Sequence, residues 1–121
     1  MNKVLIVDDD VDNAVIQQTI VQKLGFYTQI AINGLDAIKF IKQDEPDLIL
    51  LDIFMPQMDG YETIKYIKEY FNIPIIIVSA GGNQAVKKIK DMGIIFYVQK
   101  PITPTKLQKE ITKCIKYYED K

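Results

Sequence analysis

Carboxylates follow two apolar runs of the chain, at the point where each run ends. Asp8, Asp9 and Asp10 come directly after residues 4–7, and Asp52 closes residues 48–51. If both runs are parallel strands of one sheet, these acids meet at one edge of it. Like charges brought together repel one another, so such a cluster makes physical sense mainly around a bound cation. The sequence therefore predicts a small acidic metal site.

Magnesium is the cation that suits this site, since it is bound by one or two carboxylates together with waters and a substrate phosphate. Calcium requires more oxygen ligands. Two further polar residues, Ser79 and Lys100, end later apolar runs. A hydroxyl and an ammonium beside a metal and an isolated carboxylate form a site for an incoming phosphoryl group. Asp52 is then the natural nucleophile, and its product is an acyl phosphate.

Short apolar runs alternate with longer amphipathic segments along the whole chain. We expect five strands, at residues 3–7, 27–31, 48–51, 75–78 and 95–98. Four of them are largely continuous apolar runs, which is typical of parallel strands covered on both faces by helices. The five helical stripes expected to face the sheet are Ile16, Ile20 and Leu24; Leu35, Ile38 and Ile41; Ile64, Ile67 and Phe71; Val86 and Ile89; and Leu107, Ile111, Cys114, Ile115 and Tyr118.

Residues at the ends of these segments support the same count. Asn33, Asp59 and Thr103 are suited to cap the second, third and fifth helices, and Gly25 and Gly93 to end the first and fourth. Five such repeats without a linker predict one doubly wound α/β domain over residues 1–121. For strand order 2-1-3-4-5 the first and third strands are neighbours at the switch point, where ligands bind in such sheets.

Composition excludes several classes of protein. Lys plus Arg number 15 and Asp plus Glu 16, which leaves no basic footprint for direct contact with nucleic acid or an anionic membrane. The absence of histidine excludes imidazole chemistry and ordinary zinc sites. One cysteine, Cys114, excludes an internal disulfide framework, and no apolar stretch approaches the length of a membrane span. We expect a reduced, cytoplasmic protein.

The acid pair Asp8-Asp9, the acceptor Asp52 within residues 51–60, Ser79-Ala80 and Lys100-Pro101 occur in order at strand ends. With these motifs the sequence resembles a response-regulator receiver domain, the flavodoxin-like fold of two-component signalling, with a five-stranded parallel sheet and five flanking helices.

The resemblance implies a role for each of these residues. Asp9 and Asp52 ligate Mg²⁺ directly, Asp8 acts through water, and the backbone carbonyl of Phe54 is the third protein ligand. Lys100 contacts the phosphoryl oxygens, and its bond to Pro101 is cis. Ser79 and Tyr97 form the switch.

The resemblance also implies the biological role. A sensor histidine kinase or histidine phosphotransfer protein supplies a phosphoryl group to Asp52, and the surface of the fourth helix, fifth strand and fifth helix then signals to a downstream target protein or output domain. Such a chain is not an enzyme in the usual sense, because it catalyses only its own phosphorylation and dephosphorylation. It is either a stand-alone regulator or a receiver cut from a longer one.

Two alternatives stay open beside this reading. A constitutive interaction module with the same fold would bind partners without phosphorylation. A magnesium-dependent phosphohydrolase of the dehalogenase-like superfamily also uses a strand-end aspartate, but it wants a second aspartate where this chain has Phe54. The lysines of the last two helices are either a solvated face or a partner surface.

Three departures from the usual receiver pattern carry their own expectations. Phe54 is large and apolar where many receivers carry a polar side chain, so we expect slow self-dephosphorylation. Gly81, Gly82 and Asn83 predict a loose loop and a mobile fourth helix. Asp10 is expected to be solvated or to cap a helix.

Overall fold

The computed structural model describes residues 2–55 and 58–120. Met1 and Lys121, the ends of the expected domain, and Pro56 and Gln57 of the acceptor motif lie outside the described residues. Strands and helices alternate strictly along the described chain. They are β1 (Lys3–Val7), α1 (Val11–Lys23), β2 (Tyr27–Ala31), α2 (Gly34–Gln43), β3 (Leu48–Leu51), α3 (Gly60–Tyr70), β4 (Ile75–Ser79), α4 (Asn83–Asp91), β5 (Phe96–Gln99) and α5 (Pro104–Glu119).

The strands form one parallel sheet of order β2-β1-β3-β4-β5, which confirms the flavodoxin-like, doubly wound topology. Val7 lies opposite Leu51 in the register of β1 and β3, so the residues that follow them, Asp8 and Asp52, emerge side by side. The first three strands have the expected bounds. β4 extends one residue further, to Ser79, and β5 begins at Phe96, because Ile95 is largely exposed and precedes the ladder with β4.

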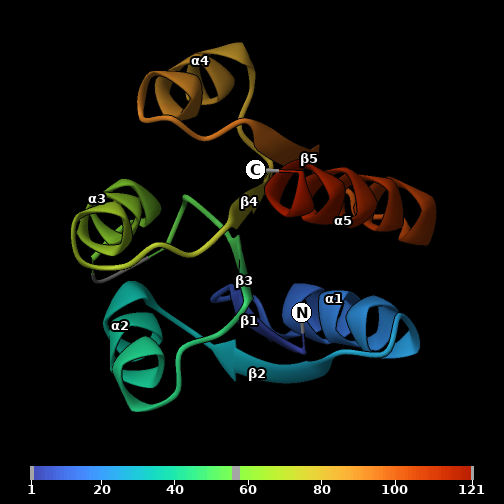
Figure 1. Cartoon of the computed structure of the whole chain (residues 1–121). Helices are drawn as coiled ribbons and strands as arrows, with labels where there is room; N and C mark the ends of the chain where they lie inside the picture. The colour runs from blue at the N-terminus through green and yellow to red at the C-terminus, as the bar shows by residue number, and fades with distance from the viewer. Residues whose placement is uncertain (1, 56–57, 121) are drawn as a thin grey trace.

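Helices cover both faces of the sheet (Figure 1). α1 and α5 lie on one face, and α2, α3 and α4 lie on the other. Leu5 and Val7 of β1 belong to the core beneath α2 and α3, whereas Val4 and Ile6 belong to the core beneath α1 and α5. Successive side chains of a strand point to opposite faces, so a strand covered twice must be apolar throughout. This is why the runs at residues 4–7 and 48–51 are continuous.

Three of the expected helix stripes were partly wrong. Ile16, Leu35 and Tyr118 are exposed, whereas their neighbours Ile20 and Ile38 are buried as expected. In α1 the buried positions are Ala14, Gln17, Ile20 and Val21. The stripe is rotated because a small residue and a polar one, rather than Ile16, face the sheet.

Helix ends confirm the expected caps. Asn33, Asp59 and Thr103 each accept a hydrogen bond from the backbone N–H three residues on, and Asp10 caps α1 in the same manner. Gly25 and Gly93 have φ values of 97° and 86°, the left-handed conformation that ends a helix.

Gly60 allows α3 to approach the end of β3 closely. A Cβ on Gly60 would lie 2.2 Å from Cα of Ile53, so only glycine lets α3 begin against the end of β3. The Lys100-Pro101 bond is cis, as the resemblance implies.

In the part of the chain that the structure describes, no helix combines the length and the apolar character that a bilayer crossing requires.

Candidate functional site

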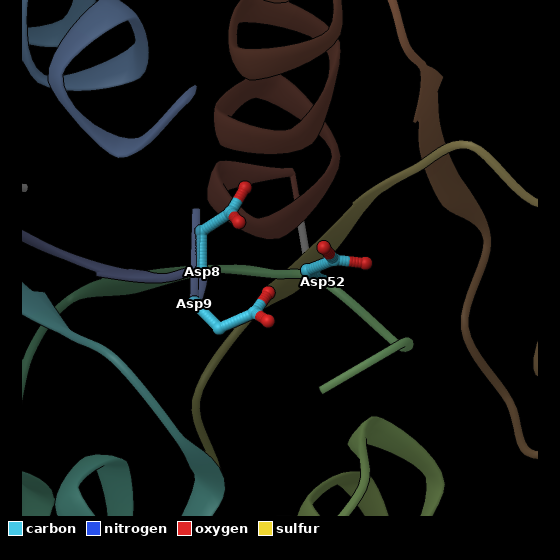
Figure 2. A group of neighbouring side chains, drawn as sticks. All are labelled: Asp8, Asp9 and Asp52. Carbon is cyan, nitrogen blue, oxygen red and sulfur yellow. The ribbon is translucent and has the colours of Figure 1, made fainter. Parts of the chain in front are cut away.

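Three carboxylates meet at the carboxyl ends of β1 and β3 (Figure 2). Asp8 and Asp9 extend from the end of β1 and Asp52 from the end of β3, and one oxygen of each lies within 4.8 Å of the others. Asp8 and Asp52 are buried, whereas Asp9 is exposed. Acidic oxygens at this spacing, with one ligand open to solvent, fit a small hard divalent cation that keeps several waters. The expected convergence of the three acids is therefore present.

Lys100 reaches the same point from the end of β5. Its ammonium donates to Asp8 Oδ2 at 2.9 Å and to Asp52 Oδ2 at 3.0 Å. Its side chain is only 14% exposed, so all three groups are held away from bulk water. Burial alone would lower the pKa of Lys100, but the hydrogen bonds and charges of the two carboxylates outweigh burial and raise it. The lysine is therefore a cation at physiological pH.

Asp8 is the most enclosed of the acids, and burial raises its pKa despite the hydrogen bonds from Lys100 and from the backbone N–H of Asp10. The side-chain amide of Gln17, a residue of α1, donates to Asp8 Oδ2 at 3.1 Å. The sequence interpretation did not include Gln17. The available signal was a polar residue in α1 flanked by apolar positions, because a buried amide requires a partner.

Phe54 follows Asp52 by two residues, and Ser79 ends β4, the strand beside β3. The backbone N–H of Phe54 donates to Asp52 Oδ1 at 3.1 Å, while the Phe54 side chain is 55% exposed. Ser79 is fully buried at the end of β4, and its Oγ accepts from the backbone N–H of Gly81 at 3.4 Å. A Cβ on Gly81 would lie 2.9 Å from the Phe54 ring, so this ring lies over the loop that follows Ser79. Gly81 is packed, whereas Gly82, the next residue of this loop, has open space around it.

Tyr97 connects this loop to β5. Its hydroxyl donates to the carbonyls of Gly81 and Ser79 at 2.5 and 3.2 Å, and its backbone N–H donates to Glu110 Oε2 at 2.9 Å. Burial, then the charge of Asp52, raises the pKa of the Tyr97 phenol, so it stays a neutral donor. The two residues predicted to form the switch are therefore joined by a direct hydrogen bond.

Strands β1, β3, β4 and β5 thus end in acids, a hydroxyl and an ammonium at one edge of a doubly wound sheet, which is the arrangement of a receiver domain. A family model described as the response regulator receiver domain matches residues 4–112. The chain belongs to this family, the receiver domains of two-component response regulators.

Curated relatives include sporulation initiation phosphotransferase F of Bacillus subtilis, which is 34% identical over 113 residues, 92% of this chain and 91% of that protein. A probable transcriptional regulator, ycf27 of Guillardia theta, is 36% identical over 90% of this chain but 43% of that protein. The chain likewise spans 26% of the transcriptional regulatory protein ZraR of Klebsiella oxytoca and 50% of the Cyanophora paradoxa ycf27 regulator.

Solved structures give the same fold. A CheY-like receiver domain protein from Methanospirillum hungatei has a TM-score of 0.89 with 25% identity, and the match covers 99% of this chain and 98% of that one. The chemotaxis protein CheY4 of Vibrio cholerae has a TM-score of 0.81 with 27% identity over 94% of this chain and 98% of that one.

Proposed function

We propose that this chain accepts a phosphoryl group on Asp52 from a phosphohistidine of a sensor kinase or histidine phosphotransfer protein. The observation that carries the proposal is the Asp52 carboxylate, which is buried beside two further acids and hydrogen-bonded by Lys100 and by the N–H of Phe54. The chain has no histidine of its own, so the donor is a separate group.

In the transfer, an oxygen of Asp52 attacks phosphorus and the phosphorus–nitrogen bond of the donor breaks. The donor ring, protonated on its other nitrogen, leaves as neutral imidazole, and Asp52 becomes an acyl phosphate. Lys100, already within hydrogen-bonding distance of Asp52, then has phosphoryl oxygens to contact. Asp9 and Asp52, with the Phe54 carbonyl and with Asp8 through water, would hold Mg²⁺. When bound, this ion supplies positive charge for the phosphoryl oxygens.

The new phosphoryl oxygens would also accept a charge-assisted hydrogen bond from the Ser79 hydroxyl, whose oxygen accepts from the N–H of Gly81 in the structure. We propose that the serine hydroxyl turns toward them and that the loop of Ser79 and Gly81 follows. Tyr97 donates to the carbonyls of both residues, so movement of the loop changes the position that the phenol prefers. A bistable element of this kind is biased by charge-assisted hydrogen bonds. The surface of α4, β5 and α5 would carry the change to a target protein or output domain.

The relatives support two forms of onward signal. The B. subtilis relative is named as a phosphotransferase and is matched almost end to end, which favours passing the phosphoryl group onward. The longer relatives are named as transcriptional regulators, which favours an output domain in those proteins. In either role the chain catalyses only its own phosphorylation and dephosphorylation. The phosphohydrolase alternative lacks its second aspartate, because Phe54 occupies that position.

The test is intact mass after incubation with acetyl phosphate, with and without Mg²⁺, on the wild type and on Asp52→Asn. We expect one added phosphoryl group that requires both Mg²⁺ and Asp52. An adduct that persists in Asp52→Asn would place the chemistry on another residue. The absence of an adduct with acetyl phosphate and with a phosphorylated histidine kinase would favour the constitutive interaction module.

A further inference from the structure

Gln17 is a buried amide on the face of α1 that packs against the sheet. It is 1% exposed, and the other buried residues of this helix, Ala14, Ile20 and Val21, are all apolar. Burying an amide among apolar side chains is unfavourable unless the amide is hydrogen-bonded. An aliphatic side chain would therefore suit this position better, unless the amide has a partner that requires it.

The amide nitrogen of Gln17 has two acceptors. It donates to Asp8 Oδ2 at 3.1 Å and to the backbone carbonyl of Asn13 at 3.2 Å. Because a carboxylate and a carbonyl both accept, the nitrogen of the amide, and not its oxygen, faces Asp8. Asn13 lies one turn earlier in the same helix, so its carbonyl fixes the direction of the amide. The backbone of α1 thus aims a donor at Asp8.

Three donors hold the Asp8 carboxylate. Oδ2 accepts from Gln17 and from the ammonium of Lys100 at 2.9 Å, and Oδ1 accepts from the backbone N–H of Asp10 at 2.9 Å. Each carboxylate oxygen has about two lone-pair sites. Among the residues that the structure describes, Oδ2 therefore has a donor for each site, whereas Oδ1 keeps one site for a further donor such as a metal-bound water.

Lys100 cannot serve Asp8 throughout the reaction. Its ammonium is shared with Asp52 at 3.0 Å, and in the proposed transfer it turns to the phosphoryl oxygens. Asp8 Oδ2 then loses one of its two donors while the site holds its metal. Gln17 remains, and so does the N–H of Asp10, because Asp10 is the N-cap of α1. This step rests on the proposed function.

We infer that Gln17 is a positioning residue for the magnesium site. It holds the Asp8 carboxylate in one orientation while Lys100 changes partners, and Oδ1 thereby stays available to a water of the ion. Gln17 acts only through Asp8 and touches neither the ion nor the phosphoryl group. Side chains that orient a metal site in this manner typically contribute about 10- to 100-fold to metal affinity. Because Asp8 acts through water, we expect the lower end of this range.

The first measurement is Mg²⁺ binding without any phosphoryl donor, followed by the amide resonances of Asp9 and Phe54 in isotope-labelled protein. Gln17→Met removes the amide and keeps the length of the side chain, and Gln17→Asn keeps an amide but withdraws it by one methylene. Gln18→Met is the matched control. Gln18 is the next residue of α1, and its amide donates to the Thr28 hydroxyl at 3.0 Å rather than to the acidic site.

The Mg²⁺ concentration at half-saturation should rise about tenfold in both Gln17 variants and stay at the wild-type value in Gln18→Met. Asp8→Asn should also weaken Mg²⁺ binding, and Gln17→Met added to it should cause little further change, because Gln17 acts through Asp8. A general loss of packing would instead add to the effect of Asp8→Asn. Circular dichroism and urea midpoints check that each variant folds.

The rate of Asp52 labelling by acetyl phosphate gives an independent readout. In Gln17→Met the Mg²⁺ concentration for half the maximal rate should rise about tenfold, while the rate at saturating Mg²⁺ approaches that of the wild type. A positioning role predicts this separation, because excess metal compensates for weaker binding. A lower rate at saturating Mg²⁺ with an unchanged half-saturating concentration would overturn it.

The inference is also overturned if the wild type does not bind Mg²⁺, if a folded Gln17 variant binds it as the wild type does, or if Gln18→Met weakens binding equally. Gln17→Asn decides the outcome if Gln17→Met does not fold. Normal Asp52 labelling with the same Mg²⁺ dependence in every variant rejects the positioning role and retains the acceptor function. Mg²⁺ binding that depends on Gln17, in a protein that forms no adduct, retains the positioning role and rejects the acceptor function.

Discussion

The ammonium of Lys100 lies 3.0 Å from a carboxylate oxygen of Asp52, although 48 residues separate them in the chain. The same ammonium bonds Asp8, so one lysine offsets the charge of two buried carboxylates. A cation that belongs to the protein thus links these two acids.

Replacing Lys100 by Met should destabilise the metal-free protein by roughly 3 kcal/mol, because two buried carboxylates lose their counter-charge. Mg²⁺ should recover part of this loss by supplying positive charge at the same acids. Urea unfolding with chelator and with Mg²⁺ measures both effects. Lys3→Met is the control, since its partner Asp44 is 75% exposed and the pair should contribute less than about 1 kcal/mol. If Lys100→Met lowers the free energy of unfolding no more than Lys3→Met does, Lys100 is not the stabilising counter-charge of the two buried carboxylates.

Phe54→Asn should shorten the lifetime of the acyl phosphate. The exposed aromatic side chain beside Asp52 restricts the approach of the hydrolytic water, and a smaller polar side chain admits it. The lifetime is followed by loss of the adduct mass after removal of acetyl phosphate. Phe54→Leu keeps an apolar side chain and should retain a long lifetime. An unchanged lifetime in Phe54→Asn would reject the hypothesis of slow self-dephosphorylation.

Gly81→Ala should destabilise the fold by about 1 to 3 kcal/mol, the usual cost of forcing an extra carbon into a packed site. The new Cβ would lie 2.7 Å from the Cβ of Ala85 and 2.9 Å from the Phe54 ring. Gly82→Ala is the matched control, because nothing lies within 4 Å of its added carbon. Denaturant midpoints compare the two variants. Equal midpoints would show that the loop can move away from Phe54 without loss.

Backbone amides of α4 should exchange with solvent faster than those of α1. No side chain caps the start of α4 at Gly82, whereas Asp10 caps α1. Among described residues α4 buries Ala85 and Ile89, and α1 buries four side chains. Hydrogen exchange followed by mass spectrometry or NMR measures the difference. Exchange in α4 no faster than in α1 would contradict a mobile fourth helix.

The Cys114 thiol should not react with thiol reagents in the folded protein at pH 8. Burial, then the charge of Glu110, raises its pKa from 9.0 to about 12. The folded state therefore keeps the proton, and this contribution to stability is present below pH 9 and is lost as pH rises toward 12. Labelling with a chromogenic disulfide in the presence and absence of denaturant measures the reactivity of the Cys114 thiol. Rapid labelling without denaturant would place the thiol at the surface.

Sequence patterns predicted the sheet better than the orientation of the helices. A doubly covered strand must be apolar at every position, so β1, β3 and β4 stand out in the sequence. A helix needs only one apolar stripe, and which stripe is buried depends on neighbours that the local pattern does not contain. Ile16 and Leu35 have the correct spacing for a buried stripe but are exposed.

The same distinction applies to the site. Residues that end strands, such as Asp52, Ser79 and Lys100, are predictable because parallel strands bring their carboxyl ends to one edge. Gln17 lies within a helix, and its hydrogen bond to Asp8 depends on the packing of α1 on the sheet. The bond between Glu110 and Tyr97 likewise depends on how α5 lies beside β5.

The Glu110 carboxylate at the free edge of β5 also affects how two copies of the protein can pair. An exposed strand edge offers unpaired backbone groups on which another chain can build, and this is a common start of aggregation. The N–H of Tyr97 is not available for this, because a charged side chain of the same molecule accepts its hydrogen bond. A second copy that approaches this edge would have to displace Glu110 and would meet the same carboxylate on its own side. We therefore expect the hydrogen bond between Glu110 and Tyr97 to hinder strand pairing between copies at this edge.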